Sequence, residues 1–290
     1  MFLGLLLLSV VAYALQGVLV GHLARRNDLL WVGTTRGLSL LALMAPVLFW
    51  SKSGTLAMLP AYLPHLALAC GAALLANLAQ TFAMRHLAMA IATALCQGTA
   101  ALVSLALEVA IWGRWPRAIE LACVAGILAT VGVLGWISAR GAVRAPEARP
   151  LRGVFAGLGF GVSMAVALVP LGLISREVDP FVAAWAWEGG IGVVGAIALA
   201  LRALTRSAPP RPPALELARI AWCASPTLIG TAAYTLATTM GSIAIAGGVL
   251  STMMVATALI AWALHGERLS RAQWVAILVV CALLLALGLA

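Results

Sequence analysis

The residues that could do chemistry in this sequence are a few polar side chains set within long apolar segments. Primary amides occur at Gln16, Asn77, Gln80 and Gln97, each inside an apolar run. An amide side chain carries two N–H donors and a carbonyl acceptor, which a single backbone carbonyl cannot satisfy. Polar groups in an apolar solvent must face protein or water. The four amides therefore predict a polar cavity that could bind a small polar molecule.

Hydroxyl and aromatic side chains share helical faces with one another and, in one case, with an amide. Ser9, Tyr13 and Gln16 are four and three residues apart, so they lie on one face of a helix. A second such face begins at Ser251 and ends at Trp262 in the run 243–264. A single Ser or Thr often bonds only to a backbone carbonyl of its own or a neighbouring helix, and that reading stays open for each hydroxyl taken alone.

Three ionisable residues lie inside apolar runs. Glu108 shares a helical face with Gln97, and it is either a functional acid or an interfacial acid paired with Arg114. Glu188 lies between tryptophans in WAWEGGIG and could hold a cationic substrate or a coupling proton, although Trp also marks membrane interfaces. Neither acid has an obvious partner that would form a catalytic pair with it. We expect Arg36 to extend its side chain to the interface in a structural role.

Together these patterns define one set of residues predicted to bind or conduct a substrate. The set is Tyr13, Gln16, Asn77, Gln80, Gln97, Glu108, Glu188, Tyr234, Ser251 and Trp262.

The elements that must position this set are membrane-spanning helices. The 290 residues are 63% hydrophobic and 9% charged, with a mean hydropathy of +1.07, whereas a soluble domain is about a quarter charged. Apolar runs of the roughly 20 residues that cross a bilayer recur from end to end. We predict an all-α, polytopic membrane protein with helices at 2–21, 29–50, 62–84, 88–112, 117–138, 153–174, 180–201, 218–240, 243–264 and 271–289.

The chain also contains an internal duplication. Residues Thr231 to Leu289 align without a gap on Asn77 to Gly135 after a shift of 154 positions, which matches Gln80 with Tyr234. We predict a first repeat at 1–138, a linker at 139–152 and a second repeat at 153–290. Five helices per repeat is an odd number, so the repeats are inverted, an arrangement that places a binding site at their interface. We expect helices one, three, four, six, eight and nine to surround this central cavity and helices five and ten to face lipid.

Other classes of protein find little support. The five cysteines lie in apolar runs without CxxC spacing, and the four histidines share no ligand spacing, so no metal or other cofactor is expected. No GxSxG, HExxH or GxxxxGK[ST] segment is present, and we therefore predict no enzyme activity. The net charge of +9 resides in short turns, where it sets membrane orientation and does not indicate nucleic acid binding. The opening segment is predicted to be the first spanning helix and not a signal peptide.

The turn between the last two helices carries a family resemblance. Its sequence is Gly266-Glu267-Arg268-Leu269-Ser270-Arg271-Ala272-Gln273, and a second feature is Arg36 in helix two. With ten helices in two halves, the chain resembles the EamA-type members of the drug/metabolite transporter superfamily. The resemblance implies a ten-helix fold with a central cavity and transport without ATP. The first repeat departs from the pattern, with Gly113-Arg114-Trp115 in place of the acidic turn.

The leading hypothesis is a secondary transporter, with export favoured by the resemblance, that moves a small metabolite or amphiphile by alternating access. Flipping of a lipid or lipid-linked substrate is the alternative within the same fold, and an accessory membrane subunit is the alternative from another class. Expected partners are a small-molecule substrate, membrane lipids and a proton or other coupling ion, with the chain a monomer or a homodimer. We expect a multi-pass protein of the bacterial inner-membrane type.

The sequence gives two answers on orientation. Most arginines fall on one face, and the other receives only Lys52, Arg114, Arg117 and Arg176. The positive-inside rule makes the arginine-rich face cytoplasmic, with both termini outside, whereas the resemblance implies that both termini are cytoplasmic.

Overall fold

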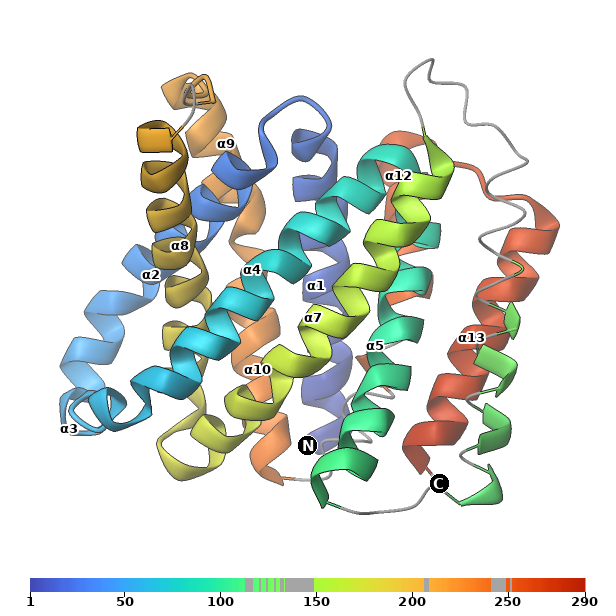
Figure 1. The fold of residues 1–290 in the computed structure, drawn as a ribbon, viewed down its shortest axis with the longest axis horizontal. Coiled ribbons are helices and arrows are strands. Elements are labelled where there is room, and N and C mark those ends of the chain that lie inside the picture. The colour runs from blue at the N-terminus through green and yellow to red at the C-terminus, as the bar shows by residue number, and fades with distance from the viewer. Residues whose placement is uncertain are drawn as a thin grey trace.

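The structure, a computed structural model, is a bundle of helices that run between two ends of the molecule (Figure 1). It describes residues 1–112, 149–205, 209–240, 249–250 and 252–289, with short stretches between 117 and 133. The secondary structure of these residues is helical throughout. The helices are α1 (Phe2–Ala24), α2 (Leu29–Ser51), α3 (Ser53–Leu56), η1 (Leu59–Tyr62), α4 (Leu63–His86), α5 (Met89–Trp112), α7 (Pro150–Glu177), α8 (Pro180–Thr205), α9 (Ala214–Ala224), α10 (Pro226–Met240), α12 (Met253–His265) and α13 (Arg271–Leu289).

The helices predicted from apolar runs are largely present. Among the described residues, five segments are long and apolar enough to cross a membrane: Phe2–Ala24, Leu29–Pro46, Gly54–His86, Pro150–Glu177 and Pro180–Thr205. The single helix expected at 218–240 is instead two, because α9 ends before Ser225 and α10 starts at Pro226. A proline has no N–H for the helical ladder and its ring crowds the preceding turn, which explains the break. Parts of the expected helices at 117–138 and 243–264 lie outside the described residues.

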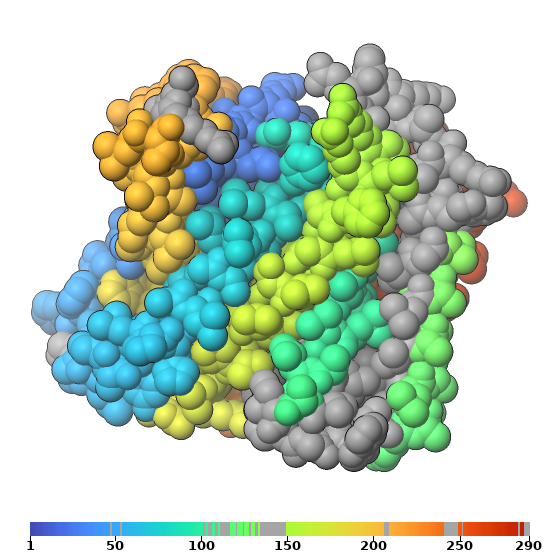
Figure 2. Space-filling model, viewed as in Figure 1, coloured from blue at the N-terminus to red at the C-terminus, as the bar shows by residue number. Residues whose placement is uncertain are grey.

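The most extensive packing joins helices that are distant in the sequence. α4 packs on α7, α2 on α8 and α1 on α10, whereas α1 makes few contacts with α2 or α4. Figure 1 shows α4 and α7 side by side, and in Figure 2 their side chains lie against each other along the face in view. The N-terminal part of the chain is therefore held mainly by the C-terminal part.

Glycines allow the closest of these approaches, between α2 and α8. A Cβ atom added to Gly37 would collide with the backbone of Gly192, and one added to Gly192 would collide with the backbone at Gly37. A short distance away, Gly195 faces Thr34 and Gly190 faces Cys70 equally closely. Small residues let helix backbones approach within a membrane, so the crossing of α2 and α8 depends on this pair of glycines.

The turn after α12 ties three helices together at the arginine-rich end. Gly266 ends α12 with a left-handed φ of +64°, a conformation that glycine adopts at no steric cost. Glu267 then accepts a 2.7 Å hydrogen bond from Arg25, just after α1, and a 3.0 Å bond from the backbone N–H of Met89 at the start of α5. The Gly-Glu turn thus serves as a clasp between α12, α1 and α5.

The opposite end, where both termini lie in Figure 1, is tied by two further contacts. Lys52 forms a 2.8 Å ion pair with Asp179 in the turn between α7 and α8, and the Tyr62 hydroxyl donates a 2.6 Å bond to Glu177. Burial raises the pKa of Asp179, but hydrogen bonds from Lys52 and from two backbone N–H groups outweigh it and lower the pKa below its usual value.

Candidate functional site

A recess opens between α1, α2 and α4, the three helices that make few contacts with one another. The space of about 360 Å³ that its lining borders includes open solvent, and the recess lies toward the end where the turn at 25–28 joins α1 to α2. Its lining is Gln16, Gly17, Val20, Gly21, Leu29, Val32, Gly33, Arg36, Asn77, Gln80, Thr81 and Met84. The recess is therefore apolar near its glycines and polar on its amide and guanidinium side.

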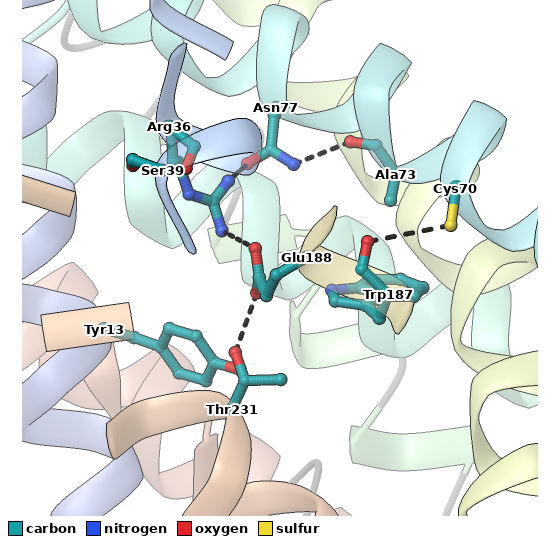
Figure 3. A network of polar contacts seen from close by, with 9 residues as sticks. All are labelled: Tyr13, Arg36, Ser39, Cys70, Ala73, Asn77, Trp187, Glu188 and Thr231. Carbon is teal, nitrogen blue, oxygen red and sulfur yellow. Dashed lines mark hydrogen bonds and ion pairs between the residues drawn. The ribbon is translucent and has the colours of Figure 1, made fainter. Parts of the chain in front are cut away.

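Arg36 connects the recess to a chain of buried polar contacts (Figure 3). The Nη1 atom of its guanidinium donates a 2.5 Å hydrogen bond to the side-chain oxygen of Asn77, and the Nη2 atom forms a 2.7 Å ion pair with Glu188. The other carboxylate oxygen of Glu188 accepts a 2.7 Å bond from the Thr231 hydroxyl, which accepts a 2.8 Å bond from the Tyr13 hydroxyl. The network joins α1, α2 and α4 to α8 and α10.

Both charges of the ion pair are withdrawn from solvent. Arg36 is 6% exposed and Glu188 is 1% exposed. An isolated ion in such surroundings is costly, whereas a hydrogen-bonded pair compensates both charges. Glu188 does not line the recess, so a molecule entering it would meet the guanidinium before the carboxylate.

Local structure explains why these side chains meet. Arg36 directly precedes Gly37, and Glu188 lies one helical turn before Gly192, so the glycine crossing places both beside the contact of α2 and α8. The side-chain nitrogen of Asn77 donates a 2.8 Å hydrogen bond to the backbone carbonyl of Ala73. The side-chain oxygen of Asn77 is thereby directed at Arg36. The charge pair and the helix crossing are consequently one unit.

The structure brings half of the predicted site residues together. Tyr13, Asn77 and Glu188 belong to the buried network, and Gln16 and Gln80 line the recess. Their part in binding or conducting a substrate stays a prediction.

The remaining predicted residues lie elsewhere. Tyr234 is 5% exposed and packs in an apolar cluster, and Gln97 in α5 is not among the residues that line the recess. Trp262 is 57% exposed and is not among the residues that line the recess, and its part in a cavity stays a prediction. The side chain of Glu108 and the whole of Ser251 lie outside the described residues.

The helix that carries Trp262, α12, has one buried side. The side of α12 turned inward carries Met254, Ala258 and Ala261, all buried, at helical spacing. Trp262 lies one helical turn after Ala258, yet it is 57% exposed, so a shared helical face does not by itself predict burial here.

The sequence interpretation missed Arg36 as a partner of Glu188. The expectation that Arg36 reaches the interface is wrong, because its guanidinium is buried and bonded to Asn77 and Glu188. Helix two was accordingly left out of the predicted cavity, although it supplies a third of the lining. A signal was present: an isolated base and an isolated acid inside apolar runs each need a partner, and the glycines in EGGIGVVG mark a close approach beside the acid.

The long apolar helices and the buried ion pair beside a polar recess define the class: a helical integral membrane protein. Residues 151–288 match the model of the EamA-like transporter family, so the second half of the chain is similar to these membrane transporters. The match confirms the resemblance drawn from the Gly266–Gln273 turn. It supports a membrane transporter of the drug/metabolite type, with a small-molecule substrate and a lipid environment.

One solved structure shares the fold. Its title reads "Crystal structure of protein", its sequence is 17% identical, and the alignment covers 98% of this chain and 95% of that chain with a TM-score of 0.63. At that identity the likeness concerns the arrangement of helices alone. The comparison with curated proteins gave no match.

Proposed function

We propose that this protein is a secondary transporter that exports a small polar metabolite across a bacterial inner membrane. The substrate enters the recess between α1, α2 and α4 and crosses by alternating access. The fold behind this proposal is a pair of inverted five-helix repeats, at 1–138 and 153–290, joined by the linker 139–152. The observation that carries it is the buried Arg36–Glu188 pair at a polar recess, since ionisable groups within spans mark substrate or ion pathways.

The two ends of the molecule differ in a way that supports a one-sided opening. The recess lies toward the arginine-rich end. At the other end, Lys52 pairs with Asp179, and Tyr62 bonds to Glu177. These contacts join α2 and η1 to the end of α7 and to the turn that follows it. A transporter with a recess open to one side and a tied opposite side corresponds to one state of an alternating-access cycle.

The network also offers a way for a substrate to bias the two states. A ligand shifts an equilibrium only through different interactions with each state. A molecule bonded to Arg36, Asn77 or Gln80 would compete with the contacts that Arg36 makes with α4 and α8. Binding is therefore linked to the packing of three helices.

The test begins with a thermal-shift screen of amino acids, amines, carboxylates and nucleosides against the purified protein, followed by counterflow of the stabilising compounds in proteoliposomes. Gln80→Ala should reduce flux at least tenfold because Gln80 lines the recess, and Gln97→Ala, which removes a membrane glutamine outside it, should keep flux near that of the wild type. Absence of counterflow for every stabilising compound would overturn the proposal. Flux that requires an acyl chain would replace it with lipid flipping.

Alternating access has a separate test at the tied end. Cysteines at positions 52 and 179, in a chain whose five native cysteines are replaced, can be joined by a short bis-maleimide because the native side chains are in contact. The cross-link should abolish flux, and each single cysteine treated in the same way should retain it. Undiminished flux through the cross-linked protein would show that this end does not open.

A further inference from the structure

Arg36 has an unused hydrogen-bond donor beside the recess. Its Nη1 and Nη2 atoms are bonded, but the buried Nε atom has no hydrogen-bond partner. Buried polar groups are nearly always bonded, and an exception asks for an explanation. The guanidinium is more than nine-tenths buried and belongs to a residue that lines the recess. Such a donor is complementary to an acceptor that the structure does not contain.

The rest of the lining points to the same kind of ligand. Gln16 and Gln80 line the recess and have no hydrogen-bond partner among the described residues, so their amide N–H groups are available. Arg36 is the one charged residue in the lining, and no carboxylate is present there. The recess thus presents a cation and amide donors, which favours an anion over a cation. The limited space and the apolar side chains of Val20, Leu29 and Met84 favour a small anion with a short apolar part.

We propose that the recess binds a small monocarboxylate, which replaces Glu188 as the partner of Arg36 while Glu188 takes up a proton, so that carboxylate and proton bind together. This inference rests on the proposed transport function and names the substrate class and the coupling ion.

The exchange is balanced in charge. The two carboxylate oxygens of the ligand accept from Nε and Nη2 of Arg36, the forked geometry in which Arg binds carboxylates best. Nη1 keeps its bond to Asn77. Glu188 loses its cation and retains only the bond from Thr231. A proton from water then joins the released carboxylate oxygen, no covalent bond between heavy atoms changes, and the site has gained one anion and one proton.

The surroundings of Glu188 supply no replacement cation. α8 packs against α2, α4, α7 and α10, and the charged residues of α7 lie at the ends of that helix. Among the described residues, two titratable or charged side chains face Glu188 directly: Arg36 of α2 and Cys70 of α4. Tyr13 of α1 is linked to Glu188 through Thr231, and Tyr234 of α10 lies near Tyr13. Since Arg36 alone among them carries a positive charge, its departure leaves the proton as the compensating charge.

The binding experiment uses the purified full chain and sets of matched probes: butyrate with butyramide and butylamine, and phenylpropionate with its amide and amine. Decanoate extends the series to an amphiphile. Carboxylates should raise the melting temperature by mass action, and the amides and amines of equal size should not. Each carboxylate that binds should be accompanied by the uptake of one proton, which a pH indicator in weak buffer would measure. The apparent affinity should fall about tenfold per pH unit as the pH rises, because one proton is linked to binding.

Variants separate this mechanism from a purely structural role. Glu188→Gln should bind carboxylates more tightly than the wild type and without pH dependence or proton uptake, since no ion pair has to be broken. The double variant Arg36→Gln/Glu188→Gln keeps the interior neutral, so it should fold, yet it should bind no carboxylate. The control is Arg25→Gln, which removes one positive charge at the arginine-rich end, outside the recess. This variant should bind carboxylates as the wild type does.

The results that overturn the inference are distinct from those that overturn transport. Stabilisation by butylamine but not butyrate, no stabilisation by any probe, or carboxylate binding without proton uptake would each refute it. Stabilisation by decanoate alone would assign the recess to a lipid and refute the small ligand. Counterflow of a compound without a carboxylate would keep the transporter and remove this substrate class. Carboxylate and proton binding without flux would keep the binding site and remove the transporter.

Discussion

Replacing Arg36 with glutamine removes the cation that compensates the buried charge of Glu188. The variant Arg36→Gln keeps a hydrogen-bonding side chain near Asn77 but leaves a carboxylate that is 1% exposed with only the Thr231 hydroxyl as partner. Removing one partner of a buried ion pair destabilises a protein by about 3–5 kcal/mol. Because 1 kcal/mol shifts the melting temperature of a chain of this size by roughly 2–4 °C, the expected decrease is on the order of 10 °C.

The double variant Arg36→Gln/Glu188→Gln gives the decisive comparison. It replaces the ion pair with two neutral amides that can bond to each other, so it should recover most of the lost stability and melt at a higher temperature than Arg36→Gln. Melting can be followed with a thiol-reactive dye, since Cys70 and Cys96 are buried and react only when the fold opens. An Arg36→Gln protein that melts with the wild type, or a double variant no more stable than the single one, would refute the reasoning.

Three further perturbations test other parts of the structure. Thr231→Val leaves the Tyr13 hydroxyl without its acceptor and Glu188 without one donor, so it should lower the free energy of unfolding by about 1–3 kcal/mol. The control is Thr235→Val. The native Thr235 hydroxyl bonds only within α10, so this change should lower the melting temperature much less. Gly192→Leu should abolish folded protein in size-exclusion chromatography because its side chain would collide with the backbone of α2, and Gly159→Leu, placed in open space, should be tolerated. Asp179→Asn should lower the melting temperature slightly at pH 7, by less than about 1 kcal/mol for so exposed a pair. The pKa of Asp179 is lowered in the fold, so its contribution to the free energy of unfolding is present at neutral pH and is lost as the pH falls through that pKa. Below that pH, Asp179→Asn and the wild type should melt at the same temperature. A difference that persists in acid would contradict the stabilising role of the Asp179 carboxylate.

The apolar runs predicted the helices well because a bilayer requires each span to be long and apolar. The run that failed was 218–240, where the composition stays apolar but the helix breaks at Ser225, directly before Pro226, whereas α2 and α7 continue through Pro46 and Pro170. Composition cannot report such a break, since it records polarity and not hydrogen-bond capacity.

The site was predicted less completely than the helices. Spacing within one helix grouped Asn77 with Gln80, and both line the recess, because periodicity reports which residues share a face. It could not pair Arg36 with Glu188, which are 152 positions apart and meet through a crossing of two glycines. Contacts of this kind depend on how closely two backbones approach, and the pattern of one helix does not contain that information.

The glycine crossing also constrains how the molecule can move. Gly37 and Gly192 bring the backbones of α2 and α8 so close that a Cβ atom on either glycine would collide with the other helix. α2 comes from the first half of the chain and α8 from the second, so a motion that separated the halves would have to break this close backbone contact. In the transport cycle proposed above, α2 and α8 would therefore move together as one body, although they come from opposite halves of the chain.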